Sequence, residues 1–291
     1  MLAGAAGIGF APILVRMSEV GPSATAFFRL LVALPFLWAW MWADRSRSAN
    51  GSRPSARNHF FLFALAGLFF TADLAIWHWS LQFTPVANST LLANFAPLFV
   101  TLGARIFLNE NITRTFIAGM LVAFSGAALL VGGHLDIGSN NFLGGSLALV
   151  AAVFYAAYLL MVKQLRARFT TITIMACSGL ASAVSLLVVA LVSKETVMPH
   201  TPKGWLVLAA LGLVSHLGGQ TLIAYALGHL PASFSSVSLL LQPVIAAVLA
   251  WVLLKEKLTL WQWTGGIVVL LGIALAGRKL STRTDAELKE M

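Results

Sequence analysis

The sequence of 291 residues is 59% hydrophobic and only 10% charged, whereas a typical soluble domain carries about 25% charged residues. A water-soluble fold of this size could not cover its surface with so few charges. The deficit extends along the whole chain, and the longest polar connection, Asp44 to Asn58, is too short to fold alone. Composition therefore excludes a soluble domain on one anchor and predicts a single domain, residues 1–291, in a lipid bilayer.

Net charge and cysteine content argue against a nucleic-acid-binding protein and a disulfide-stabilised fold. The formal charge of +9 comes mostly from residues in short loops between apolar runs, a pattern typical of contact with anionic lipid headgroups rather than nucleic acid. Cys177 is the single cysteine, so the chain cannot form an intramolecular disulfide. With no His-x-x-x-His pair or carboxylate cluster, we expect no metal and no cofactor. The apolar segment after Met1 lacks a basic leader and is interpreted as a first span, abrupt or trimmed, rather than a signal peptide.

Apolar runs alternate with short polar breaks along the whole chain, and about 20 helical residues cross a bilayer core of about 30 Å. The runs predict ten membrane-spanning helices, at residues 2–17, 22–43, 59–82, 84–108, 114–133, 141–163, 170–193, 203–227, 232–254 and 260–278.

Lysine and arginine favour cytoplasmic loops, which predicts the orientation of the spans. With the N-terminus inside, most basic residues fall on the inner side, whereas the outer side receives Arg16, Lys194, Lys203, Lys255 and Lys257. We therefore expect both termini to be cytoplasmic.

An internal repeat relates residues 84–133 to residues 230–279 without a gap. The matched positions are Pro85 with Pro231, Ser89 with Ser235, Pro97 with Pro243, Glu110 with Glu256, Thr113 with Thr259, Gly119 with Gly265, and Gly126 with Gly272. Each half, approximately 1–135 and 141–280, would hold five helices, and this odd number inverts the second half relative to the first. Inverted repeats underlie many secondary transporters, which bind substrate near the bilayer midplane between the two copies.

These features resemble the drug/metabolite transporter superfamily. The resemblance rests on the five-plus-five helices, a proline in the fourth helix of each half, and the Leu-x-Glu-x-x-Thr segments Leu108–Thr113 and Leu254–Thr259. The chain is most similar to EamA-type exporters, and among them to bacterial amino acid exporters of the YddG type. That resemblance covers nearly the whole chain and implies aromatic amino acids as substrates.

Polar side chains inside spans usually face the bundle interior or a water-filled cavity. They gather on the third, fourth, sixth, eighth and ninth spans, and we expect them to form an aromatic, neutral-polar site for a zwitterion with an apolar side chain. The candidate substrate-binding residues are Asp73, Trp77, His78, Trp79, Asn88, Asn94, Tyr155, Tyr158, His216, Gln220, Tyr225, Ser238 and Gln242.

Several of these residues have a second interpretation. The cluster of Trp77, His78 and Trp79 lies near a helix end and could instead belong to an interfacial belt. Asp73 could bind a substrate ammonium or carry a coupling proton, or it could be a structural residue paired with Arg29 or a histidine. For His216 we favour a structural role.

The repeated prolines and glutamates also have contrasting interpretations. Pro97 and Pro243 are expected in mid-helix, where a proline kinks the helix and could act as a hinge. Glu110 and Glu256 precede helices capped by Thr113 and Thr259, so we expect structural roles at those helix N-termini. The paired glycines are expected to let helices approach closely.

The sequence thus predicts a secondary transporter, not an enzyme, that exports neutral or aromatic amino acids and related metabolites across the bacterial cytoplasmic membrane. Broad drug or metabolite efflux and sugar-phosphate-like transport remain alternatives, and an intramembrane enzyme is a remote one. The absence of a Walker A pattern argues against ATP as the direct energy source. The sequence leaves the oligomeric state open, and a monomer is compatible with it.

Overall fold

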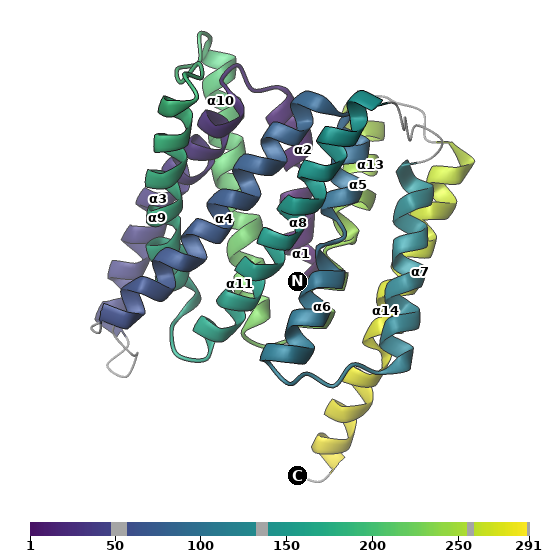
Figure 1. Ribbon diagram of the computed structural model, residues 1–291. Helices are drawn as coiled ribbons and strands as arrows, with labels where there is room; N and C mark the ends of the chain where they lie inside the picture. Colours follow the sequence, from purple (N-terminus) through teal and green to yellow (C-terminus); the bar gives the residue numbers. More distant parts are fainter. Residues whose placement is uncertain (48–56, 132–138, 255–258, 290–291) are drawn as a thin grey trace.

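A computed structural model of the protein describes residues 1–47, 57–131, 139–254 and 259–289, and all regular structure in these ranges is helical (Figure 1). Eight helices are long and apolar enough to cross a membrane, and two shorter apolar helices, Leu2–Arg16 and Arg114–Leu130, accompany them. The predicted all-α fold of ten membrane helices is confirmed.

The first half of the chain supplies spans one to five. The helices are α1 (Leu2–Gly9) and α2 (Ala11–Arg16), α3 (Pro22–Arg47), α4 (Arg57–Phe83), α5 (Val86–Ala93) and α6 (Ala96–Phe107), and α7 (Arg114–Val131).

The second half supplies spans six to ten. The helices are α8 (Ser139–Arg166), α9 (Thr171–Val192), then α10 (Pro202–Ala210), η1 (Leu211–Gln220) and α11 (Thr221–Leu227), then α12 (Ala232–Ser238) and α13 (Leu241–Leu254), and α14 (Leu260–Lys289).

Three spans are interrupted in mid-membrane, each just before a proline. Pro12 and Pro97 occupy the first turn of α2 and α6, and Pro243 is the third residue of α13. Proline lacks an N–H and clashes with a preceding helical turn, but it is tolerated in a first turn. At Pro97 and Pro243, where a kink was predicted, each span divides into two helical pieces.

The eighth span contains a long π-helical segment, η1, which packs against α1 with almost no side chain between the two backbones. A Cβ added to Gly219 would lie 2.9 Å from Ile8 N and 3.1 Å from Gly4 O. Ser215 Oγ also donates a hydrogen bond to Gly7 O at 3.1 Å. A π segment has a wider turn than an α-helix and occurs frequently at functional sites.

The last helices of the two halves, α7 and α14, run antiparallel and pack along their length (Figure 1), as inversion of the repeat requires. Glycines make the contact close: a Cβ added to Gly265 would lie 2.6 Å from Leu130 N and 2.8 Å from Gly126 O. The predicted packing role of the repeated glycines is confirmed for this pair of helices.

Candidate functional site

A small cavity of about 80 Å³ lies inside the bundle, where the three interrupted spans meet α3, α4, α8 and η1. Pro12, Asn94, Pro97 and Leu239, from the interruptions themselves, line it. Small-molecule pockets usually measure about 300–1,000 Å³, so this central pocket is closed down to the size of a few waters and must widen to admit an organic substrate.

The central pocket contains one cation and one carboxylate. Arg29 of α3 is only 3% exposed, and its guanidinium carbon lies 6.0 Å from the ring centroid of Phe70. Asp73 of α4 lines the same pocket, near enough for the two charges to interact. Among the described residues these two form no close ion pair, so both charges remain available to a ligand.

Several buried polar atoms around the pocket have no hydrogen-bond partner in the described part of the chain. They include Arg29 Nε, Trp77 Nε1, Gln220 Nε2 and Tyr155 Oη. Gln220 lies beside the Tyr155 hydroxyl without forming a hydrogen bond of normal geometry. Because an unsatisfied buried polar group is costly, this excess of donors suits a ligand rich in acceptor oxygens, such as a carboxylate.

The structure brings six of the thirteen predicted binding residues to the central pocket. They come from five different spans and are Asp73, Trp77, Asn94, Tyr155, Gln220 and Gln242. Asn94 Nδ2 donates to Thr90 O at 2.8 Å, which fixes its amide beside the break between α5 and α6.

Two further predicted residues form a second layer behind Phe70. The ring of Tyr158 stacks on Phe70 with centroids 4.5 Å apart, and the His216 ring lies 5.6 Å from Phe70. Both are almost fully buried, and neither lines the pocket.

The remaining predicted residues lie away from the central pocket. His78 Nδ1 lies 2.8 Å from Pro22 O, and Trp79 Nε1 donates to Ser23 Oγ, so both turn toward the start of α3. Tyr225 is 55% exposed and contacts His229 instead. Asn88 and Ser238 are buried in α5 and α12 without lining the pocket.

Arg29 lines the pocket but was absent from the predicted set of substrate-binding residues. A cation inside a span is expensive and marks a functional site by default, so the signal was present. Phe70 and Thr90 also line the pocket, but a phenylalanine or threonine inside a membrane helix carries no such signal.

Two larger cavities flank the central pocket, and α4 lines all three in succession. His59 and Leu62 line a cavity of about 810 Å³ at the end of the bundle where the C-terminus lies, and Phe70 to Trp77 line the central pocket. His78 and Gln82 line a cavity of about 400 Å³ on the other side. The three cavities therefore follow one another along the bundle.

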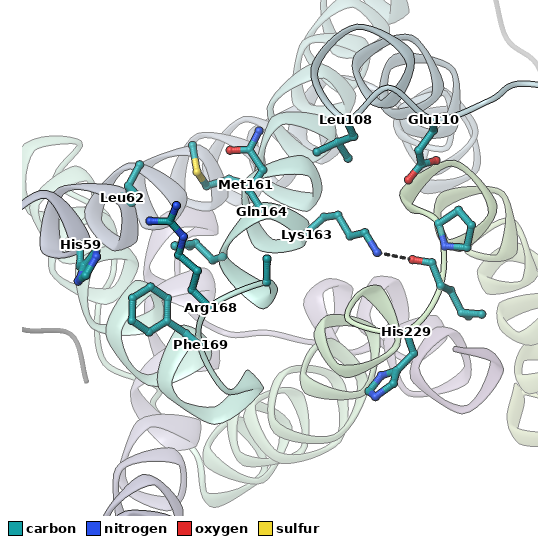
Figure 2. Close-up of a pocket in the computed structure, with 14 residues that line it drawn as sticks. His59, Leu62, Leu108, Glu110, Met161, Lys163, Gln164, Arg168, Phe169 and His229 are labelled. Carbon is teal, nitrogen blue, oxygen red and sulfur yellow. Dashed lines mark hydrogen bonds between the residues drawn. The ribbon is translucent and has the colours of Figure 1, made fainter. Parts of the chain in front are cut away.

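The 810 Å³ cavity, called the basal cavity below, is bordered by the turn that joins α11 to α12 (Figure 2). Lys163 Nζ donates to Leu227 O and Leu230 O at 2.8 Å each. Across the turn, Glu110 accepts hydrogen bonds from Ala232 N at 2.6 Å and from Ser233 N at 3.1 Å. These two charged side chains hold both ends of the turn.

The contacts of Glu110 correct one expectation. It binds the N-terminus of α12 in the other half of the chain, rather than the helix that follows it in sequence. Thr113 and Thr259 do cap their own helices, α7 and α14, through bonds from Phe116 N and Gln262 N. Glu256 lies outside the described residues.

Comparison with known proteins agrees with this architecture. The EamA-like transporter family matches residues 1–132 and again residues 142–278. A probable terminal-alkyne amino-acid exporter of Streptantibioticus cattleyicolor is 30% identical over 95% of this chain and 91% of its own length. The pseudopaline exporter CntI of Pseudomonas aeruginosa is 28% identical over 71% of each chain. One solved crystal structure superposes with a TM-score of 0.79 over 96% of this chain and 97% of its own, at 18% identity.

The family match and the relatives named as exporters identify a small-molecule transporter rather than an enzyme. The chain belongs to the EamA-like transporter family, within the drug/metabolite transporter superfamily.

Proposed function

We propose that this transporter exports amino acids with neutral or aromatic side chains across the bacterial cytoplasmic membrane, by alternating access around the central pocket. The observation that supports the proposal best is that Arg29 and Asp73 both line one pocket, among aromatic rings. A zwitterionic amino acid carries a carboxylate and an ammonium on one carbon, so its carboxylate could contact Arg29 while its ammonium contacts Asp73.

The surrounding groups fit the two ends of such a substrate. Arg29, Gln220 and Tyr155 supply donors for a carboxylate, whereas Asp73 supplies a charged acceptor for an ammonium. Phe70 and Trp77 supply apolar and cation–π surface for the rest of the molecule. The exporter of S. cattleyicolor, named for an amino acid, supports the same substrate class.

The alternatives fit this pocket less well. A phosphorylated sugar would require several cations, but Arg29 is the one cation among the residues that line the central pocket, and Asp73 would repel a phosphate. Broad efflux of hydrophobic compounds would not need an arginine and a carboxylate buried together in the membrane.

The test is counterflow of labelled Phe, Trp, Leu, Thr and Lys into liposomes that contain the purified protein, with empty liposomes as the control. We expect uptake of the neutral and aromatic amino acids and its loss in Asp73→Asn, which keeps the shape of the side chain but removes its charge. Absence of counterflow for every amino acid, with protein that elutes as a single folded species, would contradict the proposal.

A further inference from the structure

The basal cavity offers a second place for a ligand, distinct from the central pocket. It measures about 810 Å³, within the range usual for small-molecule sites, whereas the central pocket is about 80 Å³. Along α4, eight residues separate Leu62 of the basal cavity from Phe70 of the central pocket, or about 12 Å of helix. A molecule in one cavity therefore cannot occupy the other.

Some of the charged side chains that line the basal cavity already have hydrogen-bond partners, and one does not. Lys163 is bound by two carbonyl oxygens, and the carboxylate of Glu110 is bound by the N-terminus of α12. Arg168, by contrast, is exposed and makes no side-chain hydrogen bond or ion pair among the described residues. The guanidinium of Arg168 is therefore free to bind a ligand in the cavity.

The position of Arg168 is fixed by the turn that ends α8, where its N–H donates to Leu165 O at 3.0 Å. Figure 2 shows its side chain in the same cavity as His59, Gln164 and Met161. The buried Nδ1 of His59 has no hydrogen-bond partner in the described chain. The Arg168 guanidinium suits an anionic oxygen ligand.

Part of the remaining wall is apolar. The ring of Phe169 packs edge-on against His59 with centroids 5.1 Å apart, and Leu62, Leu108 and Met161 also line the cavity, beside the polar side chains of Gln164 and His229. A ligand complementary to this cavity has a carboxylate at one end and an apolar body at the other.

We propose that the basal cavity is a loading site, in which Arg168 binds the carboxylate of the substrate before the central pocket opens to receive it. The identity of the ligand as the transported amino acid rests on the proposed function, but the carboxylate chemistry does not. A lipid phosphate shares the anionic character, and the experiment below distinguishes it.

Binding of labelled 3-phenylpropionate to the purified protein in detergent tests the site without transport. We expect Arg168→Gln to weaken binding roughly five- to tenfold, because an exposed charge pair contributes about 1 kcal/mol, and Arg168→Lys to lose less. Arg105→Gln is the matched control, since Arg105 is an exposed arginine in the last turn of α6 that lines no described cavity.

The outcomes separate this inference from the proposed function. Arg168-dependent binding without amino acid counterflow would retain the carboxylate site and reject the amino acid as cargo. Equal binding by wild type and Arg168→Gln, or no binding by folded wild type, would overturn the inference. So would displacement of the label by phosphatidylglycerol at a lower concentration than by unlabelled 3-phenylpropionate, which would identify a lipid-headgroup site.

Discussion

At the residue scale, a buried arginine and a half-buried aspartate share one small pocket without pairing closely. Charged groups inside a membrane are costly unless they are paired, solvated or bound to a ligand. The unpaired donors around Arg29 show that this pocket is not a finished structural core. The proposed substrate would account for this polarity.

Gln220 and Tyr225 provide a sharp comparison, because they are close in sequence but differ in placement. Gln220→Ala should raise the KM of counterflow about tenfold, since it removes a buried donor to a charged group. Tyr225→Ala should change KM little, because Tyr225 is outside the pocket and more than half exposed. Equal KM values for the two variants would contradict this account of the pocket.

Glu19 predicts a pH dependence of stability on the face opposite the basal cavity. A hydrogen bond from the Thr201 hydroxyl, aided by those from Thr201 N and His200 N, holds the pKa of Glu19 below its ordinary value. The stabilisation is therefore complete above the unfolded-state pKa and is lost as the pH falls through the folded-state pKa. The melting temperatures of wild type and Glu19→Gln should differ at pH 7 and converge only at a pH below the folded-state pKa of Glu19.

At the element scale, the interrupted and π-helical segments determine where the pocket lies. Breaks in three spans place Pro12, Asn94 and Leu239 at one level, and η1 brings Gln220 to the same level. Loss of regular helix in a membrane is tolerated only where protein or a cavity covers the backbone. The breaks are therefore tolerated because they face the cavity, and the cavity is lined by the residues at the breaks.

Neighbouring glycines in η1 allow a direct test of the α1 contact. Gly219→Ala should destabilise the fold by about 1–3 kcal/mol, because its Cβ would meet the backbone of α1, which cannot move aside. Gly218→Ala is the control, since its Cβ would meet only Leu213 O at 3.4 Å. Thermal denaturation of the two proteins in detergent gives the comparison, and a similar melting temperature for both would contradict the packing argument.

Hydropathy was sufficient to predict the number and order of the spans, because a bilayer demands long apolar helices. The breaks were not predicted, since a proline signals a local constraint but not whether the helix bends or stops. Asp73 and Gln220 could be predicted as pocket residues, because a polar side chain that faces lipid has a high free-energy cost. Trp79 and Tyr225 could not be placed, because an aromatic residue in a membrane helix is equally compatible with a pocket and with a lipid-facing surface.

At the scale of the whole molecule, three cavities lie one after another along α4. Consecutive residues, Trp77 and His78, line the central pocket and the 400 Å³ cavity, whereas about two helical turns separate the central pocket from the basal cavity. Along α4, the central pocket therefore lies nearer to the 400 Å³ cavity than to the basal cavity.

The orientation of the bundle is tested by cysteine labelling in a Cys177→Ser background. Lys203 and Arg114 are both exposed and lie at opposite ends of the bundle (Figure 1). A membrane-impermeant maleimide should label Lys203→Cys in intact cells and Arg114→Cys only after permeabilisation. The reverse pattern would place the basal cavity outside the cell.

Carboxylates from each half bind helix N-termini that belong to the other. Glu19 binds the start of α10, Glu195 accepts a bond from Ala24 N in α3 at 2.9 Å, and Glu110 binds the start of α12. Neither half alone would contain both partners of any of these bonds. A polypeptide cut between the repeats should therefore recover activity only when both fragments are made together, and an ancestral single repeat would have needed a second copy to complete its own helix ends.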